Sequence, residues 1–176
     1  TLLKDICTCE ANNSPSKVLQ ALDCELRNTL YQNLEDGTIP GDGMDIIVCE
    51  IDLKTHYVRY ASAMRPMIIY RNGEEIFVKG SRNSVGGHYD KEDNLFEDEG
   101  LQLSKGDIIY MFSDGYSDQF GGPMGKKFKM VRLKNLLQDI HTKPMDEQCI
   151  HVKNTFHLWK ENYEQVDDVL FMGIKI

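Results

Sequence analysis

Hydrophobic residues recur at helical spacing in three parts of the chain. Ser14-Pro15 is typical of a helix start, because serine caps the first turn and proline lacks only an N–H that would stay unpaired there. A helix is therefore predicted from Pro15 to about Asn33, with an apolar face of Val18, Leu19, Leu22, Leu26 and Leu30. Two further predicted helices flank Lys143-Pro144, with apolar faces of Met130, Leu133, Leu136, Leu137 and Ile140, and of Met145, Cys149, Val152, Phe156 and Trp159.

Short apolar runs bounded by turn residues predict strands elsewhere. The runs are Met44–Ile51, Tyr57–Ala61, Met67–Tyr70, Glu75–Val78, Ile108–Phe112 and Val169–Ile176. Asn72-Gly73 lies between two of them and predicts a tight hairpin. Consecutive short strands of this kind predict an antiparallel meander.

Composition narrows the class of protein. The chain has 176 residues and a formal net charge of -8, which argues against a nucleic-acid binder because such proteins need a cationic surface. No apolar run approaches the roughly 20 residues that span a bilayer. Five scattered cysteines, an odd number, favour reduced thiols in a cytoplasmic protein.

Two acidic clusters adjoin the most apolar strands of the second half. Asp114 and Asp118 follow Ile108–Phe112, whereas Asp167 and Asp168 precede the last strand. If these strands are antiparallel neighbours, the clusters meet at one edge, where a divalent cation would relieve their repulsion. Carboxylates without imidazole or thiol favour Mg²⁺ or Mn²⁺. Aspartates are also common where a strand meets a turn, so the clusters could instead be structural.

Five stretches, taken in order, resemble one known family. Asp107–Gly115 is an apolar strand followed by Ser-Asp-Gly, and Gln165–Ile174 carries Asp-Asp before a second apolar strand. The full set is Gly43–Asp45, Ala61–Gly73, Ser84–Gly87, Asp107–Gly115 and Gln165–Ile174. The set is similar to bacterial serine phosphatases of the stage II sporulation protein E type. That family is a branch of the metal-dependent protein phosphatase 2C superfamily.

The resemblance implies a fold and a set of site residues. The expected fold is α+β: a two-sheet antiparallel sandwich flanked by helices, with residues 1–176 as a single phosphatase-like domain. Asp114 and Asp167 are expected to be catalytic and to bind metal, and the backbone of Gly115 is expected to approach the metals. Asp118 is expected to be an additional, weaker metal ligand. Asp168 is expected to lie behind the ligands rather than to bind metal itself.

The resemblance also implies an activity. The expected reaction is hydrolysis of phosphoserine or phosphothreonine by water activated by two Mn²⁺ or Mg²⁺ ions, with no covalent intermediate. The expected substrate is a phosphoprotein of the anti-sigma-factor-antagonist kind. Sensor or membrane domains are expected upstream of this cytoplasmic domain.

One part of the family pattern is missing from the sequence. The family carries an upstream aspartate with Gly-His-Gly nearby, which bridges the two metals, and no such motif occurs here. Together with the start at Thr1, this predicts a C-terminal fragment, N-terminally incomplete and of low activity alone. An edge left open in this way could also be covered by a homodimer. The alternative function is a non-catalytic, phosphatase-like protein-binding module.

A short cationic run lies close to the Asp114 cluster. Lys126-Lys127-Phe128-Lys129 follows that cluster by a few residues. It could meet a phosphoprotein, or it could be the solvated start of the next helix.

Overall fold

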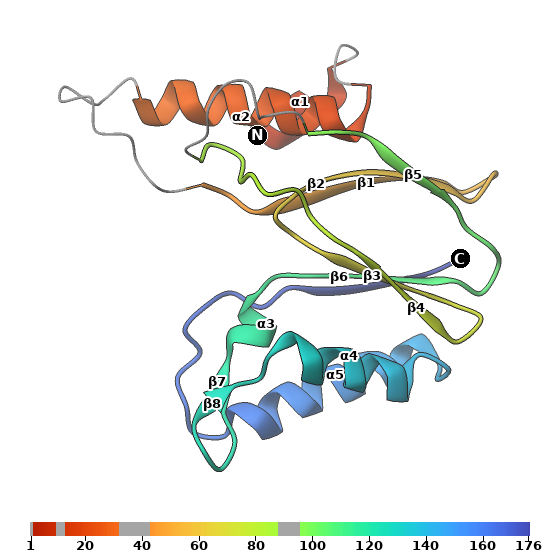
Figure 1. Ribbon diagram of the computed structural model, residues 1–176, viewed down its shortest axis with the longest axis vertical. Helices are drawn as coiled ribbons and strands as arrows, with labels where there is room; N and C mark the ends of the chain where they lie inside the picture. The colour runs from red at the N-terminus through yellow and green to blue at the C-terminus, as the bar shows by residue number, and fades with distance from the viewer. Residues whose placement is uncertain (1, 10–12, 32–42, 88–95) are drawn as a thin grey trace. The chain divides into compact units, whose positions relative to one another are not determined.

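The computed structural model describes residues 2–9, 13–31, 43–87 and 96–176. The chain forms two compact units, Thr1–Pro66 with Lys79–Leu103, and Met67–Val78 with Ser104–Ile176 (Figure 1). No helix in the described part is long and apolar enough to cross a membrane.

The first unit places two helices on a three-stranded antiparallel sheet (Figure 1). Its elements are α1 (Leu2–Thr8), α2 (Pro15–Tyr31), β1 (Ile46–Asp52), β2 (Tyr57–Ala63) and β5 (Glu99–Gln102), and the strand order is β1-β2-β5. Helix α2 begins at Pro15, as predicted, and its expected end near Asn33 lies outside the described residues. The apolar face of α2 is buried, because Val18, Leu19 and Leu22 pack with residues of β2.

The second unit is built on a four-stranded antiparallel sheet in the order β4-β3-β6-β9. The strands are β3 (Met67–Arg71), β4 (Glu74–Val78), β6 (Ile108–Phe112) and β9 (Phe171–Lys175). Asn72 and Gly73 join β3 to β4 with φ angles of 51° and 84°. Two consecutive positive φ angles are what a tight hairpin turn requires, so the predicted Asn-Gly hairpin is confirmed.

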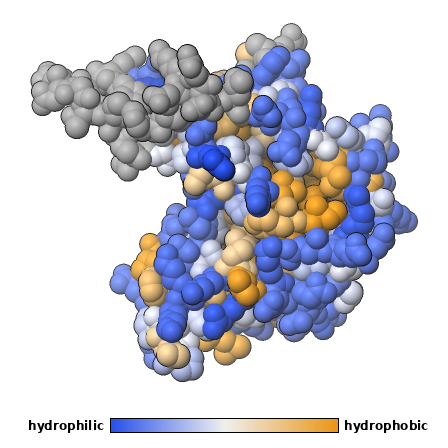
Figure 2. All heavy atoms as spheres, viewed as in Figure 1, coloured by the Kyte–Doolittle hydropathy of each residue, from blue (hydrophilic) through white to orange (hydrophobic). Residues whose placement is uncertain are grey.

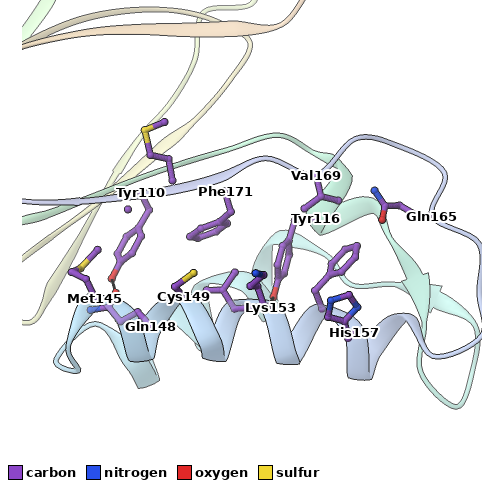
Figure 3. A pocket seen from close by; sticks show the side chains of 14 residues that line it. Tyr110, Tyr116, Met145, Gln148, Cys149, Lys153, His157, Gln165, Val169 and Phe171 are labelled. Carbon is purple, nitrogen blue, oxygen red and sulfur yellow. Dashed lines mark hydrogen bonds between the residues drawn. The ribbon is translucent and has the colours of Figure 1, made fainter.

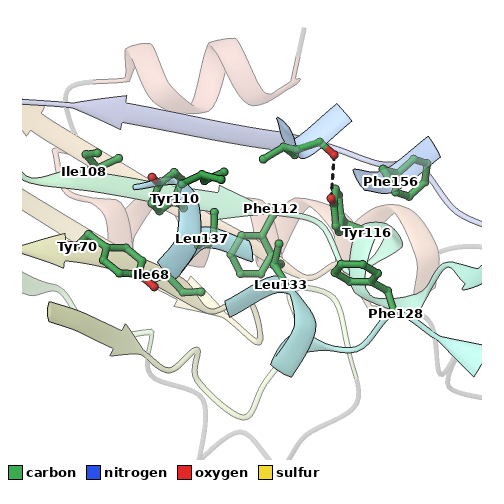
Figure 4. Packing of buried hydrophobic residues seen from close by; sticks show 12 residues of the cluster. Ile68, Tyr70, Ile108, Tyr110, Phe112, Tyr116, Phe128, Leu133, Leu137 and Phe156 are labelled. Carbon is green, nitrogen blue, oxygen red and sulfur yellow. Dashed lines mark hydrogen bonds between the residues drawn. The ribbon is translucent and has the colours of Figure 1, made fainter. Parts of the chain in front are cut away.

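Helices cover one face of this second sheet. The elements are α3 (Gly115–Asp118), β7 (Phe120–Gly121), β8 (Lys126–Lys127), α4 (Met130–Ile140) and α5 (Met145–Lys160). Alternate residues of β6 reach the helices because side chains alternate between the faces of a strand. The core so formed is largely aromatic (Figure 4), and its buried members are Ile68, Tyr70, Ile108, Tyr110, Phe112, Tyr116, Phe128, Leu133, Leu137, Ile140, Val152 and Phe156.

One prediction about these elements is wrong. The consecutive strands do not form one meander, because β2 and β3 belong to different sheets. The chain turns between them at Met64, which has a φ of 64°, and Pro66 then supplies no N–H for a ladder. Cys149 shares the predicted face of α5 with Met145, Val152 and Phe156, where it lines a cavity and stays exposed, and Gln148 beside it is buried. The buried amide is satisfied, since Gln148 accepts a hydrogen bond from Tyr110 at 2.5 Å and donates to two backbone carbonyls.

The helix face predicted for α4 gives a test of the core. Leu137 is fully buried, whereas Val131 on the same helix is 67% exposed. We expect Leu137→Ala to lower the free energy of unfolding by about 2–5 kcal/mol, because it removes buried methyl groups and leaves a cavity. Val131→Ala is the matched control and should change it by less than about 0.5 kcal/mol. Urea denaturation measures both, and equal losses would contradict the packing described for α4.

Candidate functional site

The register of β6 and β9 brings the two acidic clusters to one end of the sheet. The strands are antiparallel, and the last residue of β6, Phe112, lies opposite the first residue of β9, Phe171. The ladder continues past both strands, because the Ser113 N–H donates to the carbonyl of Leu170 at 3.0 Å. Asp114 and the Asp167-Asp168 pair therefore follow the same edge, which confirms the predicted pairing of their strands.

Ser113 holds the two segments together with its side chain. Its hydroxyl donates to the carbonyl of Asp168 at 2.8 Å and accepts from the N–H of Leu170 at 2.9 Å. Ser113 belongs to the Ser-Asp-Gly motif, but no role was predicted for it from the sequence. The sequence could have indicated this contact, because a serine hydroxyl directly before the aspartate can form hydrogen bonds with the neighbouring strand.

Gly115 lets the same two segments approach closely. A Cβ placed on Gly115 would lie 2.4 Å from the carbonyl oxygen of Asp168 and 3.3 Å from a methyl group of Val169. The first of these separations is too short for any side chain, so the position requires glycine. The described contact of Gly115 is thus with the backbone of Asp168, and its predicted approach to a metal stays a prediction.

The backbone of Asp114 begins the one-turn helix α3. Its carbonyl accepts hydrogen bonds from the Asp118 N–H at 2.8 Å and from the Ser117 hydroxyl at 3.1 Å. Its carboxylate makes no capping hydrogen bond to α3, although aspartate is a common helix cap. The half-buried carboxylate is therefore not used to start the helix.

The remaining predicted residues have separate surroundings. Asp167 is exposed, and its carboxylate accepts the N–H of Asp168 at 2.7 Å. Asp168 is also exposed and contributes its carbonyl to the contacts with Ser113 and Gly115. The Asp118 carboxylate pairs with the Lys127 ammonium at 2.7 Å, an ion pair that a metal would have to displace.

The donor chemistry of this edge fits a hard divalent cation. Aspartate oxygens are the ligands that Mg²⁺ and Mn²⁺ prefer, and neither histidine nor cysteine occurs in residues 113–118 or 165–170. Within the part of the chain that the structure describes, no three His, Cys, Asp or Glu side chains form a metal-binding group. The described residues thus supply the right kind of ligand and fewer than three together.

A cavity of about 610 Å³ lies next to this edge, between α5 and β9 (Figure 3). It is lined mainly by apolar and aromatic side chains, with Gln165 and Val169 on the side of the acidic segment. Burial raises the pKa of Tyr110 and of Tyr116, so their hydroxyls stay protonated and donate hydrogen bonds to Gln148 and to the carbonyl of Val152. No carboxylate lines the cavity, so it is not the place where a metal would bind.

Comparisons with known proteins agree with the motifs and the topology. The family model for stage II sporulation protein E (SpoIIE) matches residues 3–176. No significant match is found among curated proteins. The SiaA PP2C domain of Pseudomonas aeruginosa superposes with a TM-score of 0.83 at 22% identity, over 99% of this chain and 66% of that one.

Two further solved structures share the fold. The PP2C phosphatase domain of Bacillus subtilis SpoIIE, with a fragment of its regulatory domain, gives a TM-score of 0.71 at 17% identity, over 99% of this chain and 48% of that one. RsbX in complex with magnesium gives 0.58 at 13% identity, over 98% of this chain and 67% of that one. The chain thus spans about two thirds of the SiaA domain and about half of the SpoIIE structure.

The chain belongs to the stage II sporulation protein E family. Its fold is that of a protein phosphatase 2C domain, and the predicted α+β class with antiparallel sheets and flanking helices is confirmed. Membership of this family supports a serine/threonine phosphatase function.

The close approach at Gly115 leads to a first test of the site. We expect Gly115→Ala to lower the free energy of unfolding by about 1–3 kcal/mol, because the added methyl group forces the Asp168 backbone away. Gly87→Ala is the matched control, since its Cβ would meet nothing closer than 3.4 Å. Urea denaturation measures both changes. A Gly115→Ala variant as stable as the wild type would contradict the described contact.

The hydroxyl of Ser113 leads to a second test. Ser113→Ala removes both side-chain hydrogen bonds, and we expect a loss of about 1 kcal/mol and faster hydrogen exchange at the Leu170 amide. Ser113→Thr keeps the hydroxyl and is the control that should retain slow exchange. The role of Ser113 is wrong if alanine and threonine give the same exchange rate at Leu170.

Proposed function

We propose that this chain carries the phosphatase site of its family where β6 ends and β9 begins. Asp114 and Asp167 bind divalent metal there, and the substrate is phosphoserine or phosphothreonine on a regulatory protein of the anti-sigma-factor-antagonist kind. The observation that carries the proposal is the register of Phe112 opposite Phe171, which places the two acidic motifs at one edge. Residues 1–176 act as a single phosphatase-like domain in this proposal.

The proposed metals are Mg²⁺ or Mn²⁺. RsbX, which shares the fold, was solved in complex with magnesium, and a crystal of the SpoIIE phosphatase domain was presoaked with manganese. The aspartate oxygens of this chain suit either ion. Such ions, when bound, supply Lewis acidity and lower the pKa of a coordinated water.

The residues of this chain position the two carboxylates. The position of Asp114 is set by its backbone. Its carbonyl accepts the first hydrogen bond of α3, and the residue before it, Ser113, is hydrogen-bonded to Leu170. Asp167 is oriented by the hydrogen bond from the Asp168 N–H to its carboxylate. Ser113 and Gly115 keep the two segments in contact, so the distance between the carboxylates depends on these two neighbours of Asp114.

The same contacts suggest roles for Asp168 and Asp118, which lie beside the proposed metal ligands. Asp168 uses its carbonyl to hold the edge, which suits a position behind the metal ligands. Asp118 joins the metal only after releasing Lys127, which suits a weaker ligand. A cytoplasmic location and a homodimer remain predictions of the sequence.

Broadening of NMR signals by Mn²⁺ tests the metal ligands directly, even when binding is weak. We expect small amounts of Mn²⁺ to broaden the amide signals of residues 113–118 and 165–170 selectively. Asp114→Asn and Asp167→Asn should each remove this effect, because an amide oxygen carries no charge to hold the cation. Asp146→Asn, an exposed aspartate in the first turn of α5, is the matched control and should leave the broadening unchanged.

One result would favour the other class of function. If Asp114→Asn and Asp167→Asn leave the broadening as it is in the wild type, the acidic clusters are turns rather than metal ligands. The chain would then be a phosphatase-like module that binds proteins without catalysis.

A further inference from the structure

The segment after the Asp114 cluster is cationic in an otherwise acidic chain. Residues 119–138 contain five lysines and arginines and no aspartate or glutamate, whereas the whole chain carries a net charge of -8. The segment begins directly after Asp118. Positive charge is therefore concentrated beside the proposed phosphatase site.

This segment folds onto the helix that Asp114 begins. Strands β7 and β8 form a hairpin, with Phe120 opposite Lys127. The Lys129 N–H then donates to the Ser117 carbonyl at 2.7 Å, and the Phe128 N–H donates to the Gln119 carbonyl at 2.9 Å. Residues 120–129, called here the lysine hairpin, are thus attached through α3 to the edge that carries Asp114.

The cations of the segment fall into two groups. Lys127 pairs with Asp118, Arg132 lies 4.6 Å from the centre of the Trp159 ring, and Lys134 pairs with Glu75 at 2.5 Å. Lys126 and Lys129 are exposed, and neither has a carboxylate within ion-pair distance among the residues that the structure describes. These two ammonium groups are available to an anionic partner.

Lys129 also occupies a backbone conformation that lysine rarely adopts. Its φ is 72° and its ψ is 149°, a region that is essentially confined to glycine because other residues have a Cβ. A glycine would fit this position better, so a lysine here carries a conformational penalty. Penalties of this kind are concentrated at functional positions.

The lysine hairpin presents apolar surface as well as charge. Met124 is 75% exposed and Phe120 is 40% exposed. In Figure 2 the lower end of the molecule, where Figure 1 labels β7 and β8, is mainly hydrophilic with separate hydrophobic side chains. A partner would have to combine negative charge with one or two apolar side chains.

We propose that the lysine hairpin docks an acidic segment of the phosphoprotein substrate. Lys126 and Lys129 pair with carboxylates of that segment, and Phe120 and Met124 contact an apolar side chain within it. The proposal rests on the proposed function, because the segment docked belongs to the protein whose phosphoserine reaches Asp114. It adds a determinant of specificity that lies outside the metal ligands.

Binding of a labelled peptide tests the docking without any turnover. The probe is a short fluorescein-labelled peptide with phosphoserine, several glutamates and one leucine, and its fluorescence anisotropy is measured with EDTA present. We expect Lys126→Ala and Lys129→Ala each to raise the Kd about two- to fivefold and the double variant to raise it about tenfold, as is usual for exposed ion pairs. Added salt should weaken wild-type binding by screening.

Lys105→Ala is the matched control variant. Lys105 is exposed and belongs to the same unit, and it lies in the turn before β6, at the strand end opposite Asp114. The Lys105→Ala variant should leave the Kd of the peptide unchanged. The proposal is overturned if the double variant binds like the wild type, if Lys105→Ala weakens binding equally, or if a peptide with glutamine in place of glutamate binds as well. Tighter binding of single-stranded DNA than of the acidic peptide would overturn it too.

Lys129→Gly separates docking from folding. It relieves the backbone conformation and removes the charge, so we expect a higher Tm together with a weaker interaction with the peptide. A lower Tm would contradict the described conformation of Lys129, and unchanged binding would contradict its role in docking. Because EDTA removes metal from the assay, failure of peptide binding leaves the Mn²⁺ result at Asp114 and Asp167 untouched.

Discussion

The antiparallel register of β6 and β9 is the constraint on which the rest of the site depends. Phe112 lies opposite Phe171, and the ladder runs on through Ser113 to Leu170. A slip of one residue would turn every side chain of β9 to the other face, removing Phe171 from the aromatic core and Asp167 from the edge of Asp114. The core thus specifies the register, since Phe171 packs within 6.0 Å of the rings of Tyr110, Phe112 and Tyr116.

At this edge, the residues that hold the acidic segments in place differ from the residue whose carboxylate could bind a metal. Ser113 and Gly115 hold the acidic segments together through backbone contacts, whereas the Asp114 carboxylate is not used to cap α3. The cationic segment that follows is divided in a similar way. Lys127 pairs with Asp118, whereas Lys126 and Lys129 pair with no carboxylate among the described residues. A chain with a net charge of -8 thereby keeps positive charge beside its acidic edge.

Sequence reasoning was most successful where the local signal was strong. Ser14-Pro15 located the start of α2, and Asn72-Gly73 located a hairpin, because both depend on a few adjacent backbone conformations. It failed where distant partners decide the outcome. The meander was wrong because strand adjacency is not encoded within a strand. The burial of Gln148 was not predicted, because it depends on hydrogen bonds with Tyr110 and with two carbonyls. Ser113 was overlooked as a contact because its partners lie 55 and 57 residues away along the chain.

The sequence by itself determined the family, the three long helices α2, α4 and α5, six of the strands and the two acidic motifs. Those features are read from short-range periodicity and from the order of motifs along the chain. Only the tertiary structure decided that Gly115 serves close packing against Asp168, that Asp118 is paired with Lys127, and that Lys129 adopts a conformation suited to glycine. The physical reason is that each of these depends on a contact or a backbone angle imposed by packing, and no local pattern of residue types specifies such a contact.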